Sequence, residues 1–326
     1  LFYVEVRNPD GSMNGIFVNR LKDKLGTRMV PTAELTLDGA RAIAVIGTRD
    51  GIKNITPMLT ITRTWNAVCA VGGMRRALAL AKDYARRRVA FGAPLADKPL
   101  HVDTLASLEA EYQGALLIAF RSVELLGKEE AGELNEHEAA LLRLLTPIVK
   151  LLTAKQAVTI ASECLEAFGG AGYIEDTGLP RMLRDAQVLP IWEGTTNVLS
   201  LDLLRVLSKG GSLEPLAREI HACVKGADPS LKEPAEAALR AVEHAGAWLM
   251  RTLESGGPSA VEAGARRLAI TLGRALELAL LVREATRSKP AGDDAKPAAA
   301  ARRFWRNGVD LVEDDALDAD ARTLLG

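Results

Sequence analysis

Pro190-Ile191-Trp192-Glu193-Gly194-Thr195-Thr196-Asn197 is the stretch on which the fold and function of this chain depend. Its one carboxylate, Glu193, follows an apolar run, and a helix is predicted directly after it, over residues 198–207. An apolar wall raises the pKa of a carboxyl group toward neutrality, which suits a base that abstracts a proton. The free N–H groups of a helix N-terminus suit a phosphate or a developing oxyanion. The alternative is a helix start with Thr195 or Thr196 as N-cap and Glu193 in solvent.

The composition of the 326 residues is that of a helical globular protein. Aromatic residues make up only 4%, and the abundance of Ala, Leu and Arg favours helices. A net charge of −1 gives no basic excess that would indicate nucleic-acid binding. The three cysteines are far apart and the histidines show no metal-ligand spacing, so we expect no disulfide, no metal and a reducing, cytoplasmic location. No apolar run long enough to span a membrane is expected.

Long amphipathic segments predict a bundle of four helices between residues 55 and 208. Apolar side chains recur every three to four residues over about 56–88, 100–127, 136–167 and 196–208. Pro147 lies inside the third segment and is expected to kink or break it. Because the connections between these helices are short, an antiparallel, up-and-down arrangement is predicted.

The bundle is flanked by two segments of different character. Residues 1–48 alternate short β-strand patterns with turn clusters, but two to four strands are too few for an independent core, so we expect upstream residues or another chain to complete the sheet. After residue 209 the pattern predicts helices at about 213–225, 231–253 and 258–288, a linker at 289–297, a short helix at 302–312 and an acidic tail. The expected fold class is therefore mainly α, with a partial antiparallel β segment, an up-down helical bundle and a further helical C-terminal region.

Four motifs, in this order and spacing, resemble the acyl-CoA dehydrogenase family. They are Arg88-Val89-Ala90-Phe91-Gly92, Phe168-Gly169-Gly170-Ala171-Gly172-Tyr173, Arg184-Asp185 and Trp192-Glu193-Gly194-Thr195. Residues 24–28 (Lys-Leu-Gly-Thr-Arg) and 31–35 (Pro-Thr-Ala-Glu-Leu) look like the end of that family's middle β domain. The resemblance covers about residues 1–208, and residues 191–197 together with the helical C-terminal region look closer to its AidB-like branch. It implies half of a middle β domain at 1–54, a flavin and acyl-CoA domain at 55–208 and a helical extension at 209–326.

The resemblance implies an FAD-dependent dehydrogenase that oxidises an acyl-CoA thioester between its α and β carbons. Glu193 matches the family's base, which takes the α proton while the β hydrogen passes as hydride to flavin N5. Arg63 matches an arginine near the substrate, although a surface charge near a helix start is an equally good interpretation. Trp192 replaces a common tyrosine and either lines the acyl pocket or packs in the core.

The resemblance also implies a set of residues in contact with FAD. Arg88 would pair with the pyrophosphate of a neighbouring subunit, because a planar guanidinium can donate two hydrogen bonds to a phosphate; the alternative is a cation that stabilises a helix C-terminus. Glu166 departs from the family, which usually has glutamine there, and an ionised carboxylate only accepts hydrogen bonds. The implied contacts are Arg88, Phe91, Glu166, Gly169, Gly170, Thr195 and Asn197.

Three functions remain open at this point. The first is an acyl-CoA dehydrogenase, or its C-terminal portion, that forms a homo-oligomer (a dimer of dimers) with shared FAD sites and passes electrons to an electron-transfer flavoprotein or to oxygen. The second is an AidB-like flavoprotein of the alkylation response that associates with DNA and has little dehydrogenase activity. Its candidate DNA contacts are Arg266, Arg267, Arg274, Arg302, Arg303 and Arg306, although Glu262, Glu277 and Glu284 interleave with part of that set. The third is a structural bundle without an active site.

Overall fold

The computed structural model describes residues 1–288, 295–314 and 323–324. It divides into two compact units, Leu1–Thr62 and Arg63–Gly326, and helix α1 (Gly51–Arg87) begins in the first and continues into the second. The predicted linker at 289–297 and the acidic tail lie largely outside the described residues. The expected regions 1–54, 55–208 and 209–326 stay a prediction.

In the first unit the strands pair two by two. Strand β1 (Phe2–Tyr3) is antiparallel to β4 (Ile43–Ala44), and β2 (Ile16–Leu21) is antiparallel to β3 (Ala33–Leu37). The buried Asn14 joins the segments, because its amide donates hydrogen bonds to the carbonyls of Glu5 and Arg41, each at 2.9 Å. Among the side chains described in this unit, only Ile16 belongs to the buried apolar core, as expected for strands too few to enclose one.

The four predicted bundle helices are confirmed. They are α1, α2 (Pro99–Ala131), α3 (Glu136–Glu166) and α5 (Thr196–Ser208). Local signals set their ends: Gly132 ends α2 in the left-handed conformation, and Asn135 with Glu138 forms a capping box that starts α3. Helix α3 continues through Pro147, so the break considered there is absent.

Short elements connect these helices. A hairpin of β5 (Val89–Ala90) and β6 (Ala93–Pro94) and the 3-10 turn η1 (Leu95–Asp97) lie between α1 and α2. The 3-10 turns η2 (Gly169–Tyr173) and η3 (Glu175–Thr177) follow α3. They lead into α4 (Leu179–Ala186), a helix that the sequence pattern did not predict.

The C-terminal region is helical, as predicted, but its last helix begins at Lys296, inside the predicted linker, and ends at Arg306 rather than at residue 312. It contains α6 (Glu214–Val224), the 3-10 turn η4 (Pro229–Leu231), α7 (Lys232–Ser288) and α8 (Lys296–Arg306). Helix α7 is interrupted at Gly257, whose φ of 69° and ψ of −169° are not helical, and this agrees with the two helices expected at 231–253 and 258–288. A Cβ on Gly264 would meet the Trp248 ring at 2.3 Å, so the two arms of α7 pack against each other.

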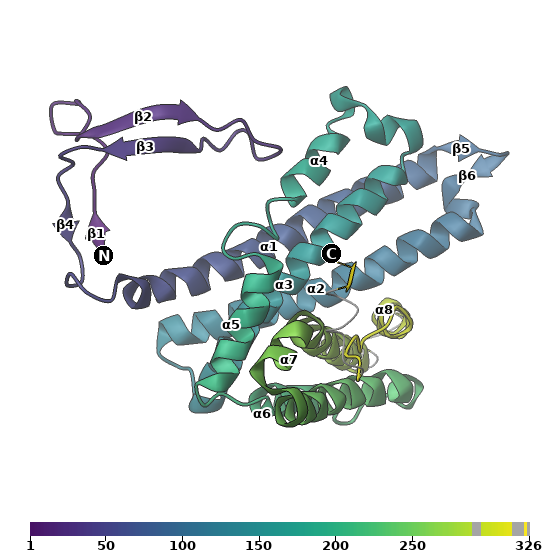
Figure 1. Cartoon of the computed structure of the whole chain (residues 1–326). Helices are drawn as coiled ribbons and strands as arrows, with labels where there is room; N and C mark the ends of the chain where they lie inside the picture. Colours follow the sequence, from purple (N-terminus) through teal and green to yellow (C-terminus); the bar gives the residue numbers. More distant parts are fainter. Residues whose placement is uncertain (289–294, 315–322, 325–326) are drawn as a thin grey trace. The chain divides into compact units, whose positions relative to one another are not determined.

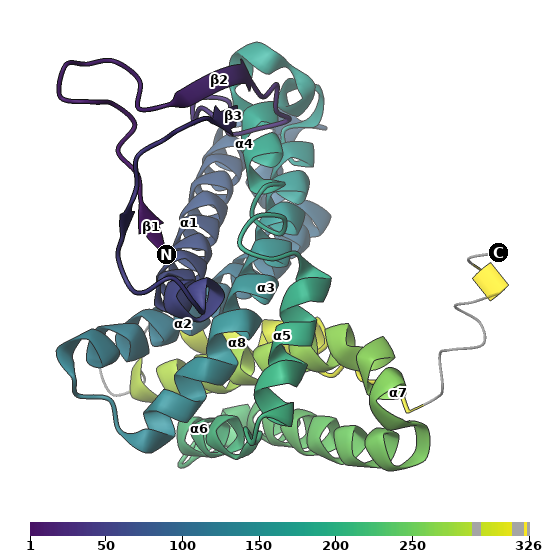
Figure 2. The ribbon, with the colours of Figure 1, turned by 60° about the vertical axis from the view of Figure 1, so that its left-hand side comes forward.

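Helix α3 is the centre of the second unit. It contacts α2, α4, α5, α6 and α7, and both views of the ribbon show α6, α7 and α8 gathered together beside the long helices (Figures 1 and 2). Contrary to expectation, α3 is apolar and long enough to cross a membrane, but 83% of its most apolar window is buried inside the fold. Burial to that extent is typical of the core helix of a bundle. The mainly α fold class is thus confirmed.

Candidate functional site

The loop of residues 187–195, called the Glu193 loop below, joins α4 to α5. Glu193 has a φ of 58° and Gly194 a φ of 106°, so both adopt left-handed conformations. For a residue with a side chain this conformation costs about 1–2 kcal/mol. Thr195 then caps α5, because its hydroxyl accepts a hydrogen bond from the Val198 N–H at 3.5 Å. The predicted N-cap is therefore confirmed for Thr195.

Side chains from two helices bind the carbonyl groups of the Glu193 loop. From α1, Arg63 Nε donates to Glu193 O at 3.2 Å and Asn66 Nδ2 donates to Leu189 O at 3.4 Å. From α3, Lys150 Nζ donates to Gly194 O at 2.6 Å. Three carbonyl groups of one loop are thus held by three side chains, which restrains the strained conformation at Glu193.

Arg63 is partly buried and paired, so its interpretation as a surface charge is wrong. Its guanidinium forms an ion pair with Asp202 of α5 at 2.9 Å, and the two side chains are only 15% and 16% exposed. Because Asp202 also pairs with Arg205, the carboxylate is itself oriented. Helices α1 and α5 are therefore joined directly beneath the Glu193 loop.

Lys150 is fully buried in the middle of α3. Desolvation, and after it the Arg63 guanidinium, lower the pKa of its ammonium group, the Glu193 carboxylate raises it, and the net value is about 8. Two oxygens of α1, Thr64 Oγ1 and Asn66 Oδ1, are buried and have no hydrogen-bond partner among the described residues. The underside of the loop is thus cationic and shielded from water.

The apolar wall predicted around Glu193 forms only in part. Leu189 is buried, but Ile191 is 60% exposed and Trp192 is 43% exposed. Trp192 therefore does not pack in the core of this chain, which removes one of its two interpretations. The side chains lie outward because the loop is held from within through its backbone carbonyls rather than through its apolar groups.

A second group of predicted residues lines one open cavity of about 610 Å³, at the ends of α1 and α3. Phe91 is 95% exposed there and has a φ of 50° at the tip of the β5–β6 hairpin. The cavity is enclosed in part by Phe168, whose ring lies 4.7 Å from that of Tyr84. The predicted residues that line it are Arg88, Phe91, Glu166, Gly169 and Gly170.

The polar groups of this cavity carry charges of both signs. Arg88 and Lys98 contribute cations, and Lys98 Nζ donates to Phe91 O at 2.8 Å. His101 Nε2 is buried and has no hydrogen-bond partner in the part of the chain that the structure describes, whereas Glu163 and Glu166 contribute carboxylates. Gly170 leaves open space where a Cβ would stand, so a ligand could reach the backbone there.

Comparison with known proteins shows the family to which the chain belongs. Residues 49–208 match the family model described as acyl-CoA dehydrogenase, C-terminal domain. The chain belongs to the acyl-CoA dehydrogenase family. Acyl-CoA dehydrogenase family member 11 of Caenorhabditis elegans is 46% identical over 297 residues, which cover 89% of this chain and 48% of that protein. AidB of Escherichia coli is 34% identical over 254 residues, which cover 74% and 46% respectively.

The fold of a solved acyl-CoA dehydrogenase agrees along nearly the whole chain. The crystal structure of Caenorhabditis elegans ACDH-11 in complex with C11-CoA superposes with a TM-score of 0.93 at 40% identity and covers 99% of this chain and 55% of that one. Both sequence alignments are longer than the 208 residues that precede the extension, so they include part of it. The chain spans about half the length of the curated relatives it matches.

Within this family frame, the structure brings the predicted residues into two groups. Arg63 bonds directly to the loop that carries Glu193, Trp192 and Thr195, and Asn197 lies in the first turn of α5. The second group lines the cavity described above.

Sequence reasoning missed Lys150, Asn66, Asp202 and His101. The signal for Lys150 was an isolated lysine inside the apolar run Ile148-Val149-Lys150-Leu151-Leu152, since a lysine is almost never fully buried unless it has a partner. No comparable signal marks the other three.

Three of the six arginines considered as DNA contacts are paired with carboxylates. Arg303 is bonded to Asp103 and Ser107, and Arg267 lies 3.9 Å from Glu313. Arg274 is buried and forms a bidentate pair with Glu111 of α2, at 2.8 and 3.0 Å. Half of the proposed basic stripe is therefore neutralised by carboxylates.

Arg274 belongs to a buried polar group that we call the Glu277 cluster: Glu111, Gln156, Arg274 and Glu277. Gln156 Nε2 donates to Glu277 at 3.1 Å and to Glu111 at 3.2 Å. Desolvation raises the pKa of the fully buried Glu277 carboxyl well above its usual value. The cluster joins α2, α3 and α7.

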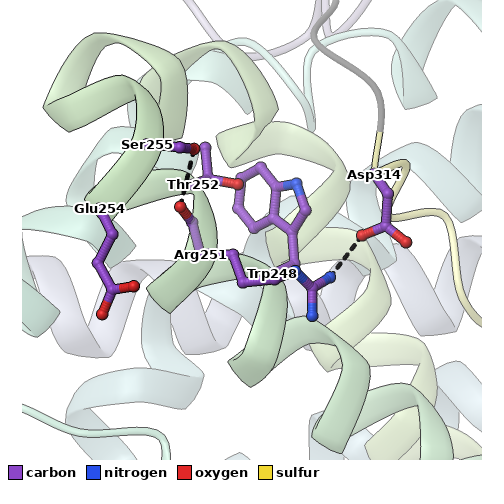
Figure 3. A pocket seen from close by; sticks show the side chains of 6 residues that line it. All are labelled: Trp248, Arg251, Thr252, Glu254, Ser255 and Asp314. Carbon is purple, nitrogen blue, oxygen red and sulfur yellow. Dashed lines mark hydrogen bonds and ion pairs between the residues drawn. The ribbon is translucent and has the colours of Figure 1, made fainter.

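A second cavity, of about 520 Å³, lies on α7 far along the sequence from the predicted residues. Figure 3 shows Arg251 bonded to Asp314 and the Ser255 hydroxyl bonded to the Arg251 carbonyl, at 2.6 and 2.9 Å. It is lined by Trp248, Arg251, Thr252, Glu254, Ser255 and Asp314. None of the residues predicted for cofactor or substrate lines it, so we do not assign the reaction to this cavity.

Proposed function

We propose that this chain is the C-terminal half of an FAD-dependent acyl-CoA dehydrogenase, with Glu193 as the base that removes the α proton. The observation that carries the proposal is the Glu193 loop, in which Glu193 is held in a left-handed conformation by Arg63 and Lys150. Family membership and the complex of ACDH-11 with C11-CoA support an acyl-CoA thioester as the substrate. A branched or straight acyl chain fits this proposal equally well.

The cavity at the ends of α1 and α3 fits part of an FAD molecule. Arg88 can donate two hydrogen bonds to a phosphate, and the buried Nε2 of His101 lacks a partner within the described residues. Gly169 and Gly170 leave space for close approach of an adenosine group. Glu166 offers only acceptor oxygens when ionised, so it suits a ribose hydroxyl better than a pyrophosphate.

Each residue near the Glu193 loop has a distinct task in the proposed reaction. The Glu193 carboxylate accepts the proton from the α carbon, and its backbone N–H donates to the thioester carbonyl, where negative charge develops. Arg63 orients the following peptide, Glu193–Gly194, through its bond to Glu193 O. The bound FAD supplies the acceptor for the β hydride. Trp192 is exposed, so it can contact an acyl chain.

We further propose that the enzyme is a homo-oligomer with shared FAD sites, that an electron-transfer flavoprotein reoxidises the flavin and that the protein is cytoplasmic. Arg88 and Phe91 support shared sites, because they lie at an exposed hairpin that a neighbouring subunit can reach. The 34% identity to AidB supports the alternative, a flavoprotein that associates with DNA. The ion pairs of Arg274 and Arg303 with carboxylates weigh against it.

The Glu193→Gln variant tests the proposed base. An amide of the same shape cannot accept the proton, so turnover of acyl-CoA should fall by about 10²- to 10⁴-fold. The flavin should remain bound, as shown by visible absorption after desalting with added FAD. The matched control is Glu175→Gln, on the exposed turn η3, which should leave turnover unchanged. Full turnover by Glu193→Gln with bound flavin would reject Glu193 as the base.

A further inference from the structure

Lys150 poses an energetic problem that the proposed reaction does not explain. Its side chain is fully buried, yet none of the ion pairs among the described residues includes it, and its one described hydrogen bond goes to Gly194 O. A buried ammonium group is normally paired with a carboxylate. Here the nearest interacting charges are the Arg63 cation, which opposes it, and the Glu193 carboxylate.

The geometry of the peptide group shows what such a cation can do. Arg63 and Lys150 bind two consecutive carbonyls, those of Glu193 and Gly194. In a planar trans peptide the N–H points opposite to the C=O. The N–H groups of Gly194 and Thr195 therefore face away from α1 and α3, on the side opposite the two cations.

We propose that Lys150 is a positioning residue of this site: together with Arg63 it turns two consecutive carbonyls inward, which keeps Glu193 in its left-handed conformation and fixes the start of α5. The assignment rests on the proposed function only for the chemical role of Glu193. The positioning itself is a property of the chain without cofactor or substrate. Lys150 does not touch the reacting atoms, since its side chain is enclosed by the fold.

The Lys150→Met variant tests this role, because methionine has a similar length but neither charge nor N–H. The readout is hydrogen exchange of the backbone amides of Val198 and Leu199, whose hydrogen bonds to Thr195 depend on the start of α5. We expect exchange at these two amides to be at least about 10-fold faster, while the melting temperature of the protein does not fall. Lys155→Met on the same helix is the matched control and should change neither.

A purely structural role gives a different pattern. If Lys150 only contributes to stability, exchange rises along α3 and α5 alike and the melting temperature falls, and this result overturns the proposal. Unchanged exchange at Val198 and Leu199 in the folded variant also overturns it. In the complete enzyme, Lys150→Met should lower kcat more than it raises KM, because the acyl-CoA contacts are kept. Faster exchange in Lys150→Met together with full turnover by Glu193→Gln supports the positioning role and rejects only the proposed base.

Discussion

Among the buried polar side chains of helix α3, Lys150 and Gln156 have surroundings that differ in one respect. Lys150 lies under the Glu193 loop and meets a backbone carbonyl, and no described ion pair neutralises it. Gln156, six residues later, lies in the Glu277 cluster, where Arg274 and Glu111 neutralise each other through two hydrogen bonds. The paired cluster joins helices, whereas the unpaired cation acts on a loop. Burial alone therefore does not distinguish the surroundings of these two side chains, but the presence of an ion pair does.

From the comparison of Lys150 with the Glu277 cluster, we expect the largest change in the free energy of unfolding when Arg274 is replaced. Arg274→Met removes the cation that is paired with the Glu111 carboxylate in a buried position, so the free energy of unfolding should fall by about 3–5 kcal/mol. Urea denaturation measures the change. Arg266→Met, on the exposed face of the same helix, is the matched control and should stay within about 0.5 kcal/mol of the wild type. A loss below about 1 kcal/mol at Arg274 would contradict a joining role for the cluster.

The second prediction concerns Lys150, whose burial as a cation should destabilise the folded protein, whereas the Arg274 pair should stabilise it. The pKa of Lys150 is lowered from 10.5 to about 8, so between these values the unfolded state binds a proton that the native state has lost. Stability should therefore rise with pH through this window, by about 3 kcal/mol in total. Lys150→Met should lack this rise. The measurement is the difference in unfolding free energy between the two proteins at pH 7, 9 and 10.5.

The smallest effect is expected at His244, in an ion pair near the surface. Hydrogen bonding to Asp310, and then to Asp314, raises the pKa of His244, so this stabilisation is complete below its usual pKa and is lost as pH rises through the raised value. The side chains are about one third exposed, so screening limits the pair to about 0.5–1 kcal/mol. His244→Gln should speed exchange of the Leu311 amide, which is bonded to Thr271, about 2- to 5-fold at pH 6. Equal exchange of the Leu311 amide in the wild type and in His244→Gln at pH 6 would show that the pair of His244 and Asp310 does not stabilise this region.

The sequence was sufficient for the helices because their signals are local. Asn135 with Glu138, and Gly257 with Pro258, mark helix ends within a few residues of chain, and the apolar period shows which face is buried. Helix α4 was missed because its eight residues are too few to establish a period. The family motifs contributed the order of the site residues, which no local pattern provides.

The parts that could not be predicted depend on contacts between distant residues. Arg63 and Glu193 are 130 residues apart, and Arg274 and Glu111 are 163 apart. The DNA-associated hypothesis included Arg274 as a candidate contact because the sequence cannot reveal a carboxylate on another helix. The apolar run before Glu193 predicted a wall that includes Ile191 and Trp192, whereas the loop is held through its carbonyls and these side chains are exposed.

The position of Lys150 and Gln156 on one helix has a mechanical consequence. Six residues separate them by about 9 Å along the axis and by about two thirds of a turn around it. A helix that is hydrogen-bonded on two different faces cannot rotate about its axis or shift along it without breaking one of these sets of hydrogen bonds. The C-terminal extension supplies Arg274 and Glu277 but none of the predicted catalytic or cofactor-binding residues. Through its contact with Gln156 it restrains α3, the helix whose Lys150 holds the Glu193 loop.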